Sequence, residues 1–468
     1  PSLFDSPAER YEKARQSVQH FTLVQLGKCC SDTESDLPRY VVHSYNFFLF
    51  PSTLGIRDVE FTLSASSIQF LSHYGFDYNK FLKDGIPYMN EVQEKILRQH
   101  LLAGTWKVCS NADRDVLKKA IDDVTSWIAA AKEEDTMILQ DLNGYQMLDV
   151  QLVLRQALEN VWTEPLGDTK IMVKKVSPEH RQLLENSSYD HCQKKLILLS
   201  ARGFTNLFQI LVKAKKPLVG HNMLMDLMHL HDKFYRPLPE SYEEFKKNIH
   251  NLFPVIIDTK TVTKYVQKVR CTYLFLKTKN LTHPLLFSSN LNPKGPPCPV
   301  IALASGCSRY AEKKFPHEAG YDAFLCGSVL LMSAHLLLCR STDDAVEADP
   351  SFSQYLTVLA EHVNKVNFIR GGVSSINFSG EDAPCHHPPA LVVRVRGWPG
   401  LTERQIYHEF KARCRFDVRR LSKNQFILLS NKYKQVRLVL RDYRHHPHLQ
   451  VSIYRHWRHS PSVNCLLQ

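Results

Sequence analysis

Two short stretches of the chain each place a carboxylate at the start of a predicted helix. The first contains Gly220-His221-Asn222-Met223 and leads to Asp226, and the second runs from His317 to Asp322. Two aspartates that converge from different elements beside a histidine suit phosphodiester hydrolysis. In such sites two divalent cations about 4 Å apart stabilise the attacking and leaving oxygens, and a histidine takes a proton from the attacking water.

The residues around these aspartates also allow simpler interpretations. Asp226 can be a carboxylate satisfied by backbone amides at a helix N-terminus. His229 lies on the same helical face, and we expect it to be packed rather than to bind a metal. His317 follows Pro316 and stands five residues before Asp322, so we expect it in the loop entering the helix, free to swing over a scissile phosphate.

Four blocks of the chain resemble the poly(A)-specific ribonuclease family, which are DEDD-type 3′→5′ exoribonucleases with a histidine base. The blocks are Gly220–Met223, Asp226–His229, Phe253–Lys260 and His317–Ala323, in the order of the family's motifs. The nearest resemblance is to the branch that trims piRNAs. It implies an RNase H-like α/β core with a mixed sheet.

The resemblance also assigns roles to single residues. Asp226 and Asp322 would hold two Mg²⁺ ions, and His317 would be the general base. Asn222 and Lys260 would contact the 3′-terminal nucleotides. Lys260 can equally be a solvated lysine at a strand end.

The chain departs from the family pattern in two places. The family has an Asp-x-Glu pair on its first strand, and we expect this strand and motif to be missing from the sequence. Asp58-Val59-Glu60 imitates the pair but follows the wrong strand. With two of four acidic ligands, metal affinity should collapse, so the sequence as written predicts weak or absent activity. The second departure, residues 265–304, reads as a strand-like piece and a loop where the family has a helix.

The composition predicts a basic protein of two or three domains. The chain has 468 residues and a formal net charge of +12. Basic residues outnumber acidic ones about four to one in Ala390–Gln468, and the rest is close to neutral. The basic end is a candidate phosphate-binding surface, or simply a soluble surface.

Cysteine usage and hydropathy exclude several classes of protein. The 12 Cys include no CxxC pair, which favours a reducing compartment over a disulfide framework or a structural zinc. Cys385-His386-His387 is a poor metal site because consecutive ligands rarely close on one ion. The most apolar helix, Val329–Leu338, is interrupted by Ser333 and His335, so we expect a buried core helix and no membrane span. We expect no signal peptide.

We expect five segments along the chain. Residues 1–109 and 187–345 form the two parts of the nuclease core, with strands at 21–26, closed by Gly27, and at 45–50. Residues 110–186 form a small α+β insertion. The family carries a nucleic-acid-binding module there, but its Arg-x-x-x-His motif is not clear in this chain, so a structural role stays open. Residues 346–389 are predicted to be a linker.

Residues 390–460 show the order strand, helix, strand, strand, helix, strand. Thr402–Gln405 is a capping box that opens the first helix. The order suggests an RRM-like domain, and it also fits protein-binding modules of the same topology. Of the aromatic rings that would face bases in a typical RRM, only Phe426 is plausible. We therefore favour weak binding of the RNA backbone over recognition of sequence.

The sequence thus predicts a 3′→5′ exoribonuclease that trims piRNA precursors or poly(A) tails and releases 5′-monophosphates. The alternative is a catalytically silent RNA-binding or scaffold paralogue. As partners, the resemblance implies the 3′ end of single-stranded RNA, a homodimer and a scaffold protein of the piRNA pathway. It implies a cytoplasmic location at the face of mitochondria or the endoplasmic reticulum, through a C-terminal anchor that this sequence does not contain.

Overall fold

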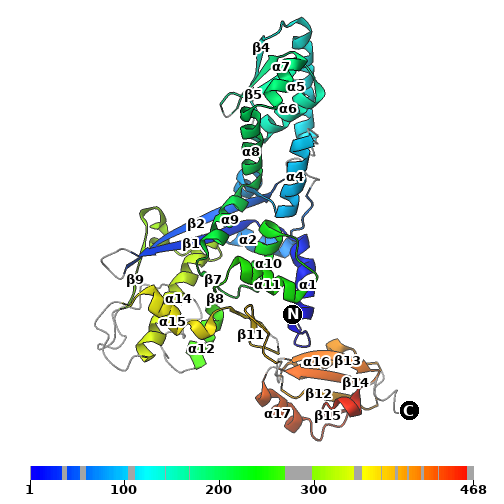
Figure 1. Ribbon diagram of the computed structural model, residues 1–468. Coiled ribbons are helices and arrows are strands. Elements are labelled where there is room, and N and C mark those ends of the chain that lie inside the picture. The colour runs from blue at the N-terminus through cyan, green and yellow to red at the C-terminus, as the bar shows by residue number, and fades with distance from the viewer. Residues whose placement is uncertain are drawn as a thin grey trace.

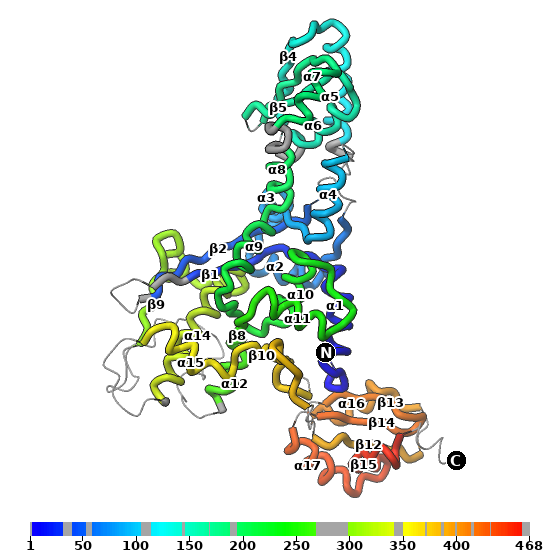
Figure 2. Tube along the Cα trace, in the orientation of Figure 1, coloured from blue at the N-terminus to red at the C-terminus, as the bar shows by residue number. Residues whose placement is uncertain are grey.

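The computed structural model divides into a core, an insertion held away from it on two helices, and a C-terminal domain (Figure 1). The N-terminus lies beside the C-terminal domain (Figure 2). The mixed α/β content agrees with the predicted fold class. The structure describes residues 2–33, 39–52, 59–103, 111–142, 144–167, 169–268, 298–341, 350–369, 372–384, 388–397, 400–412, 416–430 and 432–460.

Within the described residues, the core contains two main sheets and the helices that cover them. In one sheet β2 pairs with β1 in antiparallel and with β3 and β9 in parallel. In the other, β7 pairs in parallel with β8. The elements are α1 (Pro7–His20), β1 (Gln25–Thr33), β2 (Arg39–Pro51), α2 (Ala65–His73), α3 (Tyr78–Asp84), β3 (Ile86–Tyr88), α9 (Phe204–Ala214), β7 (Leu218–Gly220), α10 (Leu224–Leu230), α11 (Tyr242–Leu252), β8 (Ile256–Asp258), α12 (Thr259–Lys268), β9 (Val300–Leu303), α13 (Arg309–Glu312), α14 (Ala319–Ser341), α15 (Phe352–Val358), β10 (Lys365–Asn367) and β11 (Ser375–Asn377).

The first strand differs from the prediction in its position. It begins at Gln25, where the predicted strand was ending, and it continues through Gly27 to Thr33. The sequence predicts that Gly27 ends the strand, because glycine commonly bounds strands. Here it is needed inside the strand, because helix α14 passes directly over it.

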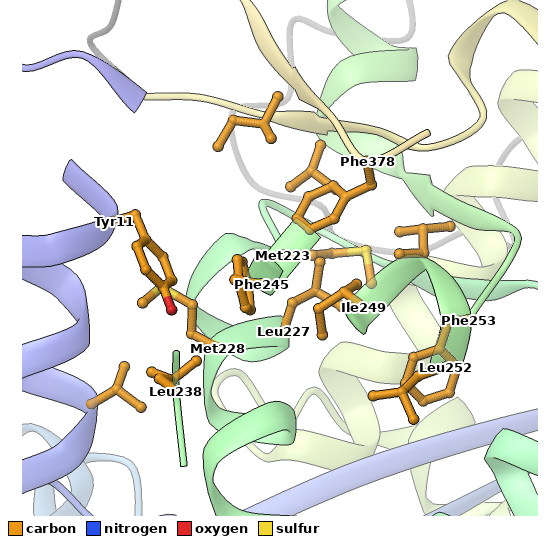
Figure 3. Close-up of a cluster of buried hydrophobic side chains, with 14 of the residues drawn as sticks. Tyr11, Met223, Leu227, Met228, Leu238, Phe245, Ile249, Leu252, Phe253 and Phe378 are labelled. Carbon is orange, nitrogen blue, oxygen red and sulfur yellow. The ribbon is translucent and has the colours of Figure 1, made fainter. Parts of the chain in front are cut away.

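The main hydrophobic cluster is built by helices α1, α10 and α11 (Figure 3). The rings of Tyr11 and Phe245 stack with centroids 4.9 Å apart. Phe378 packs on Phe245 from the hairpin β10–β11. Residues 350–369 and 372–384 thus differ from the predicted linker, because they contribute apolar side chains such as Val366 and Ile376 to this core.

Helix α14 joins the two sheets, since it packs against β1, β2 and β7 as well as α12 and α15. Among the described residues, one segment, Ala319–Arg340, is long and apolar enough to cross a membrane by length and composition, with a mean hydropathy of 1.8. Its Leu330, Leu331 and Ala334 lie in a buried cluster with α12 and α15. This packing is that of the predicted core helix, and the segment is not a clear membrane span.

The insertion sits at the far end of two neighbouring helices, α4 and α8 (Figure 1). A three-stranded antiparallel sheet of order β4-β6-β5 packs on its helices. Arg155 stacks over Trp162 at 3.7 Å and donates to Thr163, so its guanidinium is used structurally. The elements are α4 (Glu91–Ala103), α5 (Asn111–Ala130), β4 (Thr136–Leu139), α6 (Gly144–Ala157), β5 (Val161–Pro165), β6 (Ile171–Lys175), α7 (Pro178–Glu185) and α8 (Ser188–Arg202).

At the base of these helices, α8 passes into α9 through a single glycine. Gly203 has φ of 47°, and a Cβ added to it would lie 2.1 Å from the carbonyl oxygen of Pro87. Arg202 forms an ion pair with Glu94 of α4 just before it. The junction therefore requires glycine both for its dihedral angle and for its closeness to the core.

The C-terminal domain is a four-stranded antiparallel sheet of order β13-β14-β12-β15. The capping box at Thr402 opens its first helix, as predicted. Phe426 does not face outward as expected, because it is fully buried in the domain core. The elements are β12 (Leu391–Val395), α16 (Glu403–Lys411), β13 (Phe416–Ser422), β14 (Gln425–Ser430), α17 (Tyr433–Asp442), β15 (Leu449–Ile453) and α18 (His456–His459).

Some predicted features lie outside the described residues. They are Asp58, the strand-like piece at 271–276 and the segment Cys385-His386-His387.

Candidate active site

The first predicted aspartate, Asp226, lies in the first turn of α10, directly after the turn that leaves β7. In this turn Asn222 adopts φ of 61°. A Cβ added at Gly220 would lie 2.8 Å from the side chain of Met223. Glycine and asparagine fit such positions at the lowest cost. The local sequence thus fixes the direction in which α10 presents Asp226.

A second carboxylate, Asp258, holds this turn in place. It ends β8 and is fully buried. Its oxygens accept hydrogen bonds from the main-chain N–H groups of Asn222 at 2.8 Å, Met223 at 3.2 Å, Lys260 at 2.9 Å and Asn367 at 2.9 Å. Asp258 therefore ties together the starts of α10 and α12 and the strand β10.

The second predicted aspartate, Asp322, lies in the first turn of α14. The start of this helix lies very close to the sheet. A Cβ added at Gly27 would lie 1.9 Å from the carbonyl oxygen of Ala319, and one added at Gly320 would lie 2.8 Å from the amide of Asn46. The Gly320 N–H also donates to Asn46 Oδ1. Two glycines thus position the turn that carries Asp322.

The surroundings disfavour the charge of both carboxylates. Burial, together with the charge of Asp258, raises the pKa of Asp226 to about 6. Burial also raises the pKa of Asp322. Protein atoms surround the two groups, yet both side chains are accessible to water. A cation placed between such groups would relieve this electrostatic cost.

The carboxylates of both aspartates affect the thiol of Cys326. Its pKa is raised to about 12 by burial and by the carboxylates of Asp322, Asp226 and Asp258. Electrostatic interactions of this kind fall with distance. All three carboxylates therefore lie within electrostatic range of one thiol, and the convergence of Asp226 and Asp322 on a metal ion stays a prediction.

His317 lies in the turn before α14, where the sequence placed it, and adopts φ of 66°. The charge of its ring, and then a hydrogen bond from its main-chain amide, lower the pKa of the Asp322 carboxyl, which partly offsets the effect of burial. The ring is not free to swing as expected. It contacts Tyr74 and Phe70 edge to face, with centroids 4.3 Å and 4.8 Å away.

Lys260 and His229 complete the predicted set. Lys260 lies at the start of α12. Burial of His221, and then the charge of Lys260, lower the pKa of His221. His221 Nδ1 is 2.9 Å from the hydroxyl of Thr259. Burial lowers the pKa of His229 to about 4, so that histidine is neutral at physiological pH. This agrees with its expected role as a packed residue.

Comparison of the sequence with known proteins shows the family of this chain. Residues 1–330 match the model of the CAF1 family ribonucleases. The chain belongs to the CAF1 ribonuclease family. It is 57% identical over its whole length to the poly(A)-specific ribonuclease PNLDC1 of Mus musculus, of which it covers 88%. It is 28% identical to the pre-piRNA 3′-exonuclease trimmer of Bombyx mori, with 98% of this chain and 86% of that protein covered.

A more distant relative is the poly(A)-specific ribonuclease PARN of Homo sapiens, 30% identical over 71% of this chain and 55% of that protein. These relatives are named ribonucleases, which confirms the expectation of an exoribonuclease. They also confirm the resemblance on which that expectation rested.

CAF1 ribonucleases depend on divalent metal ions, and the chemistry of the two accessible carboxylates fits this requirement. Hard cations prefer carboxylate oxygens. Both aspartates have raised pKa values, so a nearby positive charge would stabilise their ionised forms. Among the described residues, no three His, Cys, Asp or Glu side chains gather closely enough to form a metal cluster by themselves.

Three features of the site were not singled out from the sequence. Asp258 lies in a motif block but received no role, although an Asp at a strand end before a helix could have suggested one. Cys326 stands four residues after Asp322, a spacing that places two side chains on one helical face. The contact of Tyr74 with His317 joins residues far apart in the chain, and no local pattern signals it.

Proposed function

We propose that this protein removes nucleotides one at a time from the 3′ end of single-stranded RNA, and that its substrates are piRNA precursors or poly(A) tails. One observation carries the proposal: α10, which follows β7, and α14, which packs against β7, each present a water-accessible aspartate in the first turn. The names of the mouse and silkworm relatives support the choice of substrate.

In the proposed reaction, a water molecule attacks the phosphorus of the last phosphodiester bond. His317 accepts the proton of that water on a ring nitrogen. The bond to the 3′ oxygen of the preceding nucleotide breaks, and a nucleoside 5′-monophosphate leaves. Asp226 and Asp322 would hold Mg²⁺, which would stabilise the charge on the attacking and leaving oxygens.

The residues around the aspartates would position the RNA. Asn222 shares a hydrogen bond of 2.6 Å with Asn367, which fixes its side chain beside the site. We propose that Asn222 and Lys260 contact the terminal nucleotides. The contacts of Tyr74 and Phe70 hold the His317 ring near Asp322. Such positioning accounts for much of the rate in enzymes of this kind.

We also propose that the C-terminal domain is RRM-like. The order β12-α16-β13-β14-α17-β15 and the sheet order β13-β14-β12-β15 support this assignment. Its basic residues would bind phosphates with little dependence on sequence. The insertion as an RNA-binding module, a homodimer, a scaffold partner and the location at mitochondria or the endoplasmic reticulum stay predictions.

The test is to follow the shortening of a 5′-labelled single-stranded RNA by the full-length protein with Mg²⁺. We expect a ladder from the 3′ end and release of 5′-monophosphates. Asp226→Asn and Asp322→Asn should each reduce the rate by at least about 10³-fold. Asp123→Asn, an exposed aspartate of the insertion helix α5, is the matched control.

Two results would overturn parts of this proposal. If the two variants shorten RNA as fast as the control, the site is elsewhere. If the full-length protein binds RNA but never shortens it, the chain is the silent RNA-binding paralogue.

A further inference from the structure

A second feature lies next to the site: a cavity of about 940 Å³ between the core and the C-terminal domain. Its core wall comes from α1, the start of α10 and the end of β10, and its other wall from α16 and β13. Figures 1 and 2 show α16 and β13 on the side of the C-terminal domain that faces the N-terminus. The volume is within the range of ligand sites.

Part of the cavity wall belongs to the turn and helix start that carry Asp226. Asn222 and Met225 line it, and Met225 is the neighbour of Asp226. Asn367, which also lines the cavity, binds both Asn222 and Asp258. A strand with its 3′ end at Asp226 could therefore continue into this cavity.

Three large apolar side chains are exposed on different walls of the cavity. They are Met225 of α10, Ile369 after β10 and Tyr407 of α16, with 40%, 46% and 40% of their surfaces exposed. Exposed aromatic and apolar groups that face one another across a cavity suit the flat faces of nucleobases, and stacking of this kind tolerates any sequence.

The charged side chains that line the cavity are three basic and three acidic ones, namely Arg10, Lys13 and Arg404 against Asp5, Glu403 and Asp417. Asp5 is paired with Lys13 at 2.7 Å. Asp417 accepts from the main-chain N–H of Leu3, and Glu403 accepts from that of Arg420 at 2.7 Å.

Against these three satisfied carboxylates, Arg404 is exposed and forms no ion pair with any residue that the structure describes. Its guanidinium is available for a phosphate, to which arginine binds with two parallel donors.

The sheet face of the C-terminal domain lacks these features. The two central strands β12 and β14 contain one aromatic residue, Phe426, and it is fully buried. Base stacking of the ordinary RRM kind has no ring to use on these strands.

We propose that the cavity binds the RNA strand upstream of the terminal nucleotide, with a base against Tyr407 and a phosphate at Arg404. This inference rests on the proposed function and extends it. The C-terminal domain binds RNA through α16 and the cavity wall rather than through its sheet face. The domain thereby forms part of the substrate site of the core.

The test compares cavity variants with matched controls on the other helix of the domain. Tyr407→Ala and Arg404→Ala change the cavity, whereas Tyr433→Ala and Arg437→Ala change exposed residues of α17 that do not line it. Tyr407→Phe keeps the ring and should behave like wild type. Melting temperatures of all variants show whether the domain is folded.

Two measurements on the full-length protein separate the inference from the proposed function. Binding of a labelled 30-nucleotide RNA in EDTA, where no hydrolysis occurs, should weaken about tenfold in the two cavity variants. With Mg²⁺, these variants should shorten the long RNA more slowly and should cleave a dinucleotide at the wild-type rate, because a dinucleotide does not reach the cavity.

The results have distinct meanings. Equal binding by cavity and control variants overturns the cavity assignment, even if wild type shortens RNA. A loss of dinucleotide cleavage in folded cavity variants also overturns it, because the residues would then act on the site itself. Weakened binding in EDTA supports the cavity, and a wild-type protein that shortens neither RNA overturns the proposed hydrolysis alone.

Discussion

The turn after β8 and the first turns of α10 and α14 use the same chemical group in opposite ways. Asp258 is fully buried, and four main-chain amides donate to it. Asp226 and Asp322 are accessible to water, and their pKa values are raised. Asp258, whose hydrogen bonds are complete, stabilises the framework. Asp226 and Asp322 have environments that disfavour their negative charge, so they are suited to bind a cation.

Within one small region, Asp258 thus contributes to the stability of the fold, and Asp226 and Asp322 to the proposed function. A buried carboxylate is tolerated when its hydrogen bonds are complete. An ionised carboxylate in a disfavouring environment reduces stability and remains useful when a ligand with positive charge binds there. The comparison therefore predicts that changes at these aspartates have opposite consequences for the fold.

The largest effect is expected for Asp258→Ala. The change leaves four main-chain N–H groups without their acceptor, and we expect a loss of about 4 kcal/mol or more. Thermal unfolding and soluble yield measure the effect. Asp226→Ala is the comparison, and it should not lower the melting temperature. Equal losses in the two variants would remove the distinction between framework and functional carboxylates.

The next effect is expected for His317→Ala, which removes the proposed proton acceptor. The rate of RNA shortening should fall about 10²- to 10⁴-fold, with little change in melting temperature because the ring lies at the surface. His20→Ala, at the exposed end of α1, is the control. A variant that keeps the wild-type rate would assign the proton transfer to another group.

A smaller effect is expected for Gly27→Ala. The added methyl group would meet the backbone of Ala319, so the start of α14 must shift. We expect a loss of about 2 kcal/mol and a rate lower by about 10- to 100-fold, because Asp322 and His317 would move together. Gly306→Ala is the matched control, since an added Cβ there has nothing within 4 Å. If both variants behave alike, the close approach does not position the site.

The smallest effect is expected for Asp226→Asn in metal-free protein. The folded pKa of Asp226 is about 6, above the ordinary value of 3.8, so its ionisation opposes folding as the pH rises through this interval. At pH 7.5 the neutral variant should melt about 2 °C higher than wild type, a small change because the side chain reaches water. The difference should shrink below about pH 4. A lower melting temperature at pH 7.5 would show that the carboxylate stabilises the fold.

The sequence predicted the local structure around Asp226, Asp322 and His317 better than the contacts that position these residues. Asp226, Asp322 and His317 follow local patterns of strand, turn and helix, and these patterns survive in the structure. The contacts of Asp258 with Asn367 and of Tyr74 with His317 join residues that are more than 100 positions apart. Only the folded chain brings such pairs together.

The wrong predictions about the fold have a related cause. Gly27 and Phe426 were interpreted from residue type alone. Gly27 lies inside β1 because α14 needs the space above it, and Phe426 is buried because of the side of the sheet on which its strand places it. The sequence predicts a linker over residues 346–389, and the strands β10 and β11 within it are only three residues long. Their packing against the core decides their structure.

Because the insertion joins the core at Gly203, a small rotation there would displace the far end of α8 by a larger distance. Helix α8 has 15 residues and so extends about 22 Å from this point. A rotation of about 10° at the base moves its far end by about 4 Å. Two contacts at the base of α8 restrict such a rotation. They are the close approach of Gly203 to Pro87 and the ion pair of Arg202 with Glu94. The position of the insertion relative to the core thus depends on a few atoms at the base of α8, far from the exposed surface of the insertion.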